Sequence, residues 1–131
     1  PKIWGTQTDP LNVGQEQHWY QPRIFSPVDW IKRDTHTSAR NQGLSGHSGK
    51  LWYRSTVEVP EHFRGRKIMI FFAGLRDGDL WINGDLIGKV PRHQPRELDV
   101  SQAVVFGAGN TIVVRTSDHG IFRPSFLWSP R

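Results

Sequence analysis

The fold is decided by the stretch KIMIFFAGLRDGDLWINGDLIGK, which covers residues 67–89. Two runs of strand-forming residues, 67–73 and 80–82, precede the pair Asn83-Gly84, and a third run covers residues 85–90. Asn-Gly between apolar runs is a strong hairpin signal, because both central positions of a type I′ turn need a positive φ. We therefore predict a β-meander over this stretch, with Asn83 and Gly84 in structural roles.

A charged loop, residues 74–79, joins the first two runs at the end of the predicted meander opposite the Asn-Gly turn. Its carboxylates, Asp77 and Asp79, form a close acidic pair, and we expect them to diverge at the start of the strand. Glycoside hydrolysis needs two carboxylates on either side of one bond. We therefore predict no catalytic role for this pair and no enzymatic activity for the chain.

Length and composition indicate one domain over residues 1–131, because 36% apolar residues are enough for a single core. The absence of cysteine excludes disulfides and thiol chemistry. No apolar run approaches the roughly 20 residues of a membrane-spanning helix, so no membrane partner is expected. A chain that begins at Pro1, without methionine or signal peptide, suggests an excised segment of a longer protein.

The net charge of +5 comes from a basic excess in which 12 of 17 residues are arginine. Such a surface favours anionic partners, and the planar guanidinium suits sulfate, phosphate and carboxylate. The alternative is an ordinary solvated surface. Because the basic residues are scattered rather than blocked, and exposed aromatic strands for base stacking are not evident, no nucleic-acid partner is expected.

Residues 1–50 are predicted to form an irregular wrapping segment, because aromatic residues occur there at uneven spacing among prolines. Trp19 and Tyr20 are the aromatic residues of this segment that are candidates for exposure, and the sequence leaves open which aromatic residues are exposed. The loop within residues 35–50 is rich in Gly and Ser, and long loops of this kind are often functional. A plain surface connection is the alternative.

Regular strands are predicted over residues 51–131. Residues 51–59 alternate between apolar and polar side chains, as a half-buried strand does. Further strands are expected around residues 98–100, 112–116 and 122–128. Residues 101–104 are predicted to form a helical turn capped by Ser101, and residues 107–110 another turn. About eight strands with almost no helix indicate an all-β sandwich.

Several short segments match one known pattern in both order and spacing. They are Leu51-Trp52-Tyr53-Arg54, Phe72-Ala73-Gly74-Leu75, Leu80-Trp81-Ile82-Asn83-Gly84, Leu98-Asp99-Val100, Gly109-Asn110-Thr111-Ile112-Val113-Val114-Arg115 and Gly120-Ile121-Phe122-Arg123-Pro124. Over nearly its whole length the chain resembles the sugar-binding jelly-roll domain of glycoside hydrolase family 2, within the galactose-binding-domain-like superfamily. The resemblance implies a jelly roll of two antiparallel sheets.

The resemblance leaves two functions open, because a fold does not determine its use. Such domains occur as carbohydrate-binding modules and as accessory domains beside a catalytic barrel. Residues 90–96 depart from the family pattern, which usually has a Gly-Gly-Tyr-like stretch there, and the loop at 118–120 is short. Both departures weaken the accessory interpretation.

Four polar loops, at 40–49, 74–79, 90–96 and 117–122, are expected to share one end of the sandwich. They carry the carboxylates, amides and arginines that sugars and their charged substituents require. The candidate ligand-binding residues are Arg40, Asn41, Gln42, His47, Arg76, Asp77, Asp79, Arg92, His93, Gln94, Arg96, Asp118 and His119.

We predict a non-catalytic carbohydrate-binding module of a secreted polysaccharide-degrading enzyme, monomeric as an isolated domain and attached to a catalytic domain in its parent chain. The expected ligand is an anionic polysaccharide, a sulfated galactan first and a uronate-containing chain second. The alternative is an accessory domain without glycan affinity of its own. No cofactor or metal is predicted, because the histidines lack metal-ligand spacing; a structural calcium at residues 77–79 is an alternative that two carboxylates support only weakly.

Overall fold

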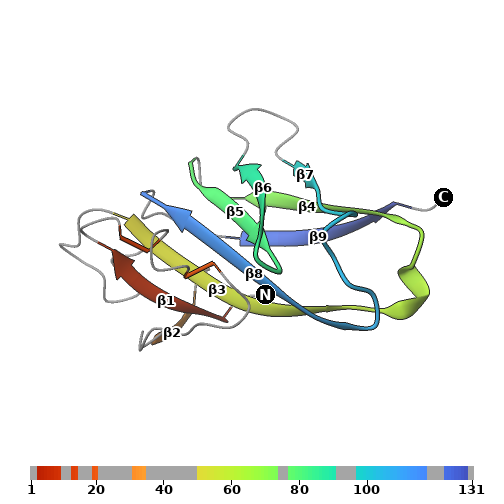
Figure 1. Cartoon of the computed structure of the whole chain (residues 1–131), viewed down its shortest axis with the longest axis horizontal. Coiled ribbons are helices and arrows are strands. Elements are labelled where there is room, and N and C mark those ends of the chain that lie inside the picture. The colour runs from red at the N-terminus through yellow and green to blue at the C-terminus, as the bar shows by residue number, and fades with distance from the viewer. Residues whose placement is uncertain are drawn as a thin grey trace.

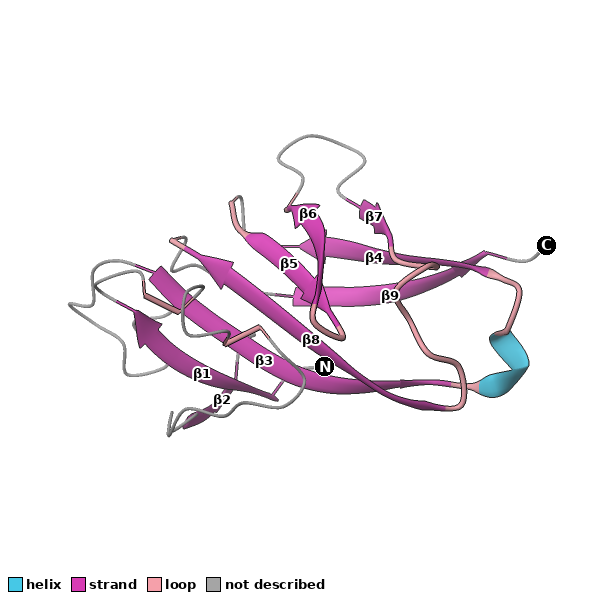
Figure 2. Ribbon diagram, in the orientation of Figure 1, coloured by secondary structure: helices cyan, strands magenta, loops and turns pink. Residues whose placement is uncertain are grey.

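The computed structural model describes nine strands in those parts of the chain that are placed, which are residues 3–9, 13–14, 19–20, 31–34, 50–73, 77–90, 97–117 and 123–129. The strands are β1 (Ile3–Asp9), β2 (Ile31–Asp34), β3 (Lys50–Val59), β4 (Lys67–Ala73), β5 (Asp79–Ile82), β6 (Asp85–Lys89), β7 (Glu97–Asp99), β8 (Ala108–Thr116) and β9 (Arg123–Ser129). Within these residues a single 3-10 turn, η2 (Glu61–Phe63), is the only helix (Figure 2). None of the described helices is long and apolar enough to cross a membrane.

Two antiparallel sheets pack as layers (Figure 1). The larger has the order β2-β1-β3-β8-β5-β6 and the smaller the order β7-β4-β9. The core between them takes alternate residues from both sheets, such as Leu51 and Tyr53 of β3, and Ile68 and Ile70 of β4, all fully buried. The predicted all-β sandwich is confirmed.

The prediction of one meander over residues 67–89 was wrong, because β4 and β5 belong to different sheets. β4 pairs with β7 and β9, whereas β5 pairs with β6 and β8. The side chains of Phe72 on β4 and Leu80 on β5 enter the same core from opposite layers. Because β4 and β5 lie in opposite sheets, each strand can turn its apolar face toward the core between the sheets. Two strands paired side by side in one sheet would not cover each other's apolar faces.

The hairpin between β5 and β6 has the predicted turn, since Asn83 and Gly84 both have positive φ, 51° and 88°. Asn83 also joins the hairpin to β8. Its backbone N–H donates to the Thr111 carbonyl at 2.8 Å, and its Oδ1 accepts the Thr111 N–H at 2.9 Å. The structural role predicted for both positions is confirmed.

A buried amide, Asn110, ties three segments together beside this turn. Its Oδ1 accepts the Val105 N–H at 2.6 Å and the Asn83 side-chain amide at 2.8 Å. Its own Nδ2 lies 3.0 Å from the Val105 carbonyl and 3.3 Å from the Val57 carbonyl. Because Asn110 is fully buried, these hydrogen bonds are shielded from solvent, and a smaller apolar side chain could not replace them.

Two further predictions about local structure need correction. The N-terminal segment is not irregular throughout, because β1 pairs with β3 and with β2 in the large sheet. Of the turn predicted at 107–110, only Gly107 is a turn, while Ala108–Asn110 begin β8 opposite Val57–Val59. In both cases pairing with a distant strand, β3, outweighs a weak local pattern.

The helical turn at 101–104 is present, with the N–H groups of Ala103 and Val104 donating to the Val100 carbonyl at 3.0 and 3.2 Å. Ser101 does not cap it. Its hydroxyl accepts the Ile68 N–H at 2.8 Å and lies 2.6 Å from Asp99 Oδ1. Ser101 therefore joins the turn to β4.

A second apolar cluster covers the outer face of the large sheet. The Trp52 and Trp81 rings stack with centroids 5.2 Å apart, Tyr20 stacks on Trp81 at 5.2 Å, and Trp19 meets Trp52 edge-on at 5.7 Å. Of the two candidates for exposure, Trp19 is buried and Tyr20 is half-buried. The outer face of the sheet thus has its own aromatic layer.

A buried carboxylate anchors this outer layer. Asp9 accepts hydrogen bonds from the N–H groups of Val13 and Gly14 at 2.8 and 2.9 Å, and from the Trp52 indole N–H at 2.8 Å. Gly14 lies directly against the aromatic rings. A Cβ at this position would come within 2.6 Å of the Trp52 ring and 2.7 Å of the Trp19 ring.

We expect Asn110→Ala to lower the free energy of unfolding by about 3 kcal/mol, because a fully buried side chain loses its hydrogen bonds to the backbone of Val57 and Val105. Urea denaturation measures this change. The control is Gln102→Ala, an exposed position in the adjacent turn, which should change stability by less than about 0.5 kcal/mol. Equal stability of the two variants would contradict the role assigned to Asn110.

We expect Gly14→Ala to destabilise the chain by about 2 kcal/mol, because the new methyl group overlaps two tryptophan rings. Tryptophan fluorescence of the folded protein should change as well, since the rings must move. The matched control is Gly109→Ala, whose Cβ meets only the methyl group of Thr56, an exposed side chain that can rotate. An unchanged fluorescence spectrum for Gly14→Ala would argue against close packing in the outer layer.

Candidate functional site

The strand ends that bear the predicted polar loops meet at one end of the sandwich. In the large sheet, Leu51 at the start of β3 pairs with Thr116 at the end of β8. Asp79 at the start of β5 pairs with both Arg115 of β8 and Lys89 at the end of β6. The small sheet also has strand ends at a common edge, where β4 finishes and β9 begins.

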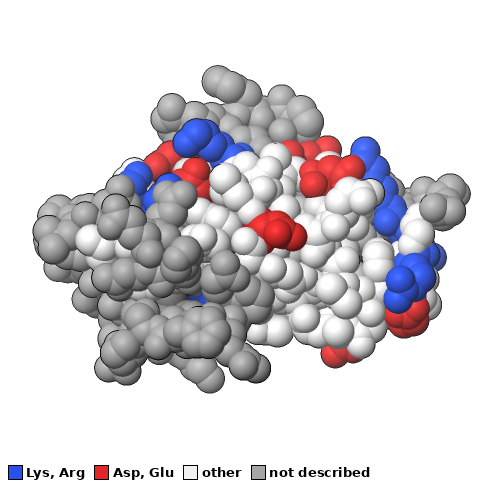
Figure 3. Space-filling view, in the orientation of Figure 1, with Lys and Arg blue, Asp and Glu red and all other residues white. Residues whose placement is uncertain are grey.

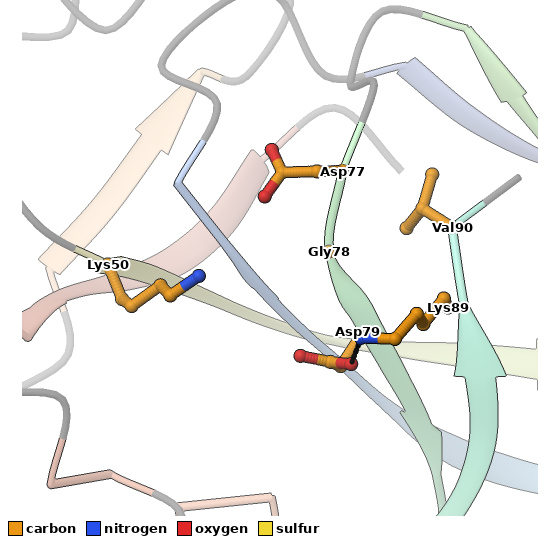
Figure 4. A pocket seen from close by; sticks show the side chains of 6 residues that line it. All are labelled: Lys50, Asp77, Gly78, Asp79, Lys89 and Val90. Carbon is orange, nitrogen blue, oxygen red and sulfur yellow. Dashed lines mark hydrogen bonds and ion pairs between the residues drawn. The ribbon is translucent and has the colours of Figure 1, made fainter. Parts of the chain in front are cut away.

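A hollow of about 210 Å³ opens at this end of the large sheet (Figure 4). Among the described residues its lining comes from the starts of β3 and β5 and from the end of β6, and it includes Lys50, Asp77, Gly78, Asp79, Lys89 and Val90. Acidic and basic side chains lie side by side at the corresponding end of the face in Figure 3. We call this feature the end hollow.

Asp77 binds the end of β8 through its carboxylate. Its Oδ2 accepts the Ser117 hydroxyl at 2.7 Å and the Ser117 N–H at 3.4 Å, while its backbone carbonyl accepts the Thr116 hydroxyl at 2.7 Å. Burial by itself raises the pKa of Asp77, but the hydrogen bonds from Ser117 and Thr116, with the nearby charge of Lys50, lower it overall. Asp77 is therefore a carboxylate held by its own chain.

Asp79 forms an ion pair across the sheet. Arg115 Nη2 lies 2.6 Å and Nε 3.1 Å from Asp79 Oδ2, and both side chains are largely buried, with 14% and 17% exposed. Lys89 Nζ lies 3.5 Å from the other oxygen, Oδ1. The Arg115 guanidinium also lies over the rings of Trp52 and Trp81, 5.6 and 5.5 Å from their centroids. The outer aromatic layer thus supports the cation that positions Asp79.

Backbone contacts shape the wall of the end hollow. Gly78 has φ 151°, and a Cβ there would lie 2.8 Å from the Arg115 carbonyl oxygen. Its own carbonyl accepts the Val90 N–H at 2.9 Å. A side chain at position 78 would therefore push β5 away from β8 and distort the hollow.

Asp77 and Asp79 line the same hollow, so the expectation that they diverge was wrong. Residues two apart in an extended chain point to the same side. Their surroundings give no sign of acid or base chemistry, because both accept hydrogen bonds or ion pairs from the protein itself. Among the described residues no group of three His, Asp or Glu side chains gathers as metal ligands would.

Of the predicted ligand-binding residues, the structure describes Asp77 and Asp79 and brings them together. The others lie outside the described residues, and their assignment stays a prediction: Arg40, Asn41, Gln42, His47, Arg76, Arg92, His93, Gln94, Arg96, Asp118 and His119. Sequence reasoning missed Lys50 and Lys89. Their position in the sequence could have pointed to them, because each lysine is the terminal residue of a strand that adjoins a predicted polar loop.

No protein-family model matches the chain. Curated proteins with similar sequences are β-glucuronidases. The chain is 29% identical over 121 residues to a β-glucuronidase of Paenibacillus borealis. The aligned region covers 86% of this chain and 19% of that protein. It is also 29% identical over 119 residues to a β-glucuronidase of Formosa agariphila. That alignment covers 82% of this chain and 12% of the relative. The chain thus spans less than a fifth of the length of these relatives.

Solved structures show the same fold within a larger enzyme. A β-glucuronidase of Ruminococcus gnavus, in complex with an N1-substituted uronic isofagomine, superposes with a TM-score of 0.74 at 22% identity, over 88% of this chain and 21% of that one. The structure of the same enzyme in complex with D-glucuronic acid gives a TM-score of 0.73. The resemblance predicted from the sequence is confirmed. The chain matches a non-catalytic, domain-sized part of much larger proteins, both in fold and in sequence.

Proposed function

We propose that the chain is a non-catalytic domain of a β-glucuronidase-like glycoside hydrolase, and that its loop end contacts an acidic glycan. The observation that carries the first part is the match of 86% of the chain to 19% of a β-glucuronidase. A segment of that size needs a catalytic domain elsewhere in the parent protein. Extracellular localisation and a monomeric isolated domain belong to the same proposal.

The end hollow supports the second part of the proposal. Two lysine side chains, Lys50 and Lys89, line it beside two carboxylates whose hydrogen bonds are made within the protein. The strands that carry the predicted arginine-rich loops end around it. Positive charge concentrated at one end of a sandwich attracts acidic ligands.

The relatives favour a uronate over a sulfated galactan as the acidic group. Arginine content alone suits sulfate and carboxylate equally. The matched proteins are β-glucuronidases, and one of the solved structures holds D-glucuronic acid. A domain carried by an enzyme of this kind would meet uronate-containing chains.

A second candidate function is an accessory domain with no glycan affinity. The observation that favours it is the engagement of Asp77 with Ser117 and of Asp79 with Arg115. Carboxylates held in this way serve the fold whether or not a sugar binds. A binding experiment on the isolated chain separates the two functions.

Affinity gel electrophoresis of the 131-residue chain tests the glycan contact. We expect a gel containing a uronate polysaccharide to retard the protein, a sulfated galactan to retard it less, and a neutral galactan to leave its mobility unchanged. If none of the three polysaccharides retards the protein, the glycan contact is wrong and the accessory domain without glycan affinity is supported. If moderate salt removes the retardation by both acidic polysaccharides to the same extent, the protein binds them through nonspecific charge attraction. Release of 4-nitrophenol from 4-nitrophenyl β-D-glucuronide by the chain would contradict the non-catalytic assignment.

The loop arginines give a second test of the same function. We expect Arg76→Ala and Arg96→Ala each to abolish retardation by the uronate gel with little change in thermal stability, because both are predicted to bind ligand and not to support the fold. The control is Arg64→Ala, an exposed residue of the turn between β3 and β4 that pairs with Glu61. A large loss of thermal stability in either loop variant would mean that the residue is structural.

A further inference from the structure

The turn between β5 and β6 has a chemical reactivity that its structural role does not use. We propose that Asn83-Gly84 is a deamidation site that the native fold protects and that unfolding exposes to reaction. Conversion of Asn83 to aspartate or isoaspartate then takes place in unfolded chains and hinders their return to the native fold. The reactants are the backbone nitrogen of Gly84 and water, so the site needs no ligand and is independent of any glycan contact.

Deamidation joins the Asn83 side chain to the backbone of the next residue. The Gly84 nitrogen gives its proton to solvent and attacks Cγ of Asn83, while the Cγ–Nδ2 bond breaks and Nδ2 leaves as ammonia with a proton from water. Water then opens the cyclic imide, at Cγ to give aspartate or at the backbone carbonyl to give isoaspartate. Glycine favours the attack because it has no Cβ to crowd the nitrogen. Asn83 is the one asparagine in the sequence that precedes a glycine.

The backbone conformation of the turn keeps the two reacting atoms apart. Ring closure requires the Gly84 nitrogen to lie on the same side of the Asn83 Cα–C bond as Cβ. Asn83 has φ 51°, in the left-handed region, and Gly84 has φ 88°. In that region a residue's own carbonyl oxygen, and not the next nitrogen, lies close to its Cβ. The chain must therefore leave the turn conformation before the ring can close.

Hydrogen bonds hold the Asn83 carboxamide at both of its polar atoms. Oδ1 accepts the Thr111 N–H at 2.9 Å, and Nδ2 donates to the Ala103 carbonyl at 3.0 Å and to Asn110 Oδ1 at 2.8 Å. The Asn83 backbone N–H donates to the Thr111 carbonyl at 2.8 Å, so that β8 fixes the turn as well as its side chain (Figure 1). Cγ cannot rotate toward the Gly84 nitrogen without breaking these hydrogen bonds, which ties the reaction to an opening of the fold.

Neither product fits the hydrogen bonds around position 83. In aspartate an oxygen replaces Nδ2 and faces two acceptors, the Ala103 carbonyl and Asn110 Oδ1. Asn110 cannot turn its own amide to supply a donor without losing two contacts to Val105, at 2.6 Å to the N–H and 3.0 Å to the carbonyl. Isoaspartate carries the backbone through Cβ, and the extra backbone atom is incompatible with a two-residue type I′ turn. Both products therefore destabilise the hairpin.

The test is peptide mapping by mass spectrometry of the 131-residue chain after incubation in mildly alkaline buffer over a series of urea concentrations. We expect the deamidation rate at Asn83 to rise with the unfolded fraction reported by tryptophan fluorescence, because a modification slower than refolding follows the unfolded population. Asn12, Asn41 and Asn110 precede residues with side chains and should react slowly throughout. An Asn83 rate that is equal in native buffer and in full denaturant would overturn the proposal.

A variant of Asn110 connects the protection to the hydrogen bonds around the turn. We expect Asn110→Ala to speed deamidation of Asn83 in native buffer by about tenfold or more, because it removes one acceptor of Nδ2 and raises the unfolded fraction. The control is Gln102→Ala, at an exposed position of the adjacent turn, which should react like the wild type. If Asn110→Ala does not fold, the urea series on the wild type still decides the question. Equal rates in a folded Asn110→Ala and the wild type would contradict the protection.

The effect of the modification on folding has its own test in Asn83→Asp, which reproduces the aspartate product. We expect this variant to raise the ratio of unfolded to folded chains by about tenfold in urea denaturation. The matched control is Gln102→Glu, which adds the same negative charge at an exposed position and should unfold like the wild type. Chains deamidated in urea should regain less of the native tryptophan fluorescence on dilution than chains unfolded only briefly. Wild-type stability of Asn83→Asp, together with full refolding of deamidated chains, would show that the modification does not hinder folding.

Discussion

The Arg115 guanidinium joins the two features on which this molecule depends, the aromatic outer layer and the end hollow. It lies over the rings of Trp52 and Trp81 and makes a 2.6 Å contact with Asp79. A charge with 14% of its side chain exposed needs a partner, and breaking a buried pair from one side typically costs about 3–5 kcal/mol. The position of Asp79 is therefore set by the sheet beneath it, not by the loop before it.

A line of contacts runs from this pair to the N-terminal part of the chain. Trp52 stacks beside Trp81 and donates its indole N–H to Asp9, which also holds the backbone at Gly14. Residues far apart in sequence thus share one buried polar network on the outer face of the large sheet. Changes to this layer would reach the end hollow through Arg115, whereas the Asn110 and Asn83 network supports the opposite end of β8.

Local sequence patterns predicted those elements that depend on neighbouring residues. Asn83-Gly84 specifies its turn because few residue pairs accept two positive φ angles. The alternation at 51–59 specifies β3, since a half-buried strand needs it. For the end hollow, the same reasoning found Asp77 and Asp79, which stand in an obvious charged loop, and missed Lys50 and Lys89, which look like ordinary ends of strands. Nothing in the local pattern shows that those two ends meet.

The sequence by itself determined the all-β class, the hairpin and the resemblance to a sugar-binding jelly roll, because turn chemistry, period-two alternation and ordered short segments are all properties of the linear chain. Only the tertiary structure decided that β4 and β5 lie in different sheets, that β1 joins the edge of β3, and that Lys50 faces Asp77. These are consequences of pairing between distant segments. Burial of both apolar faces of a strand and compensation of buried charge depend on partners that no local window contains.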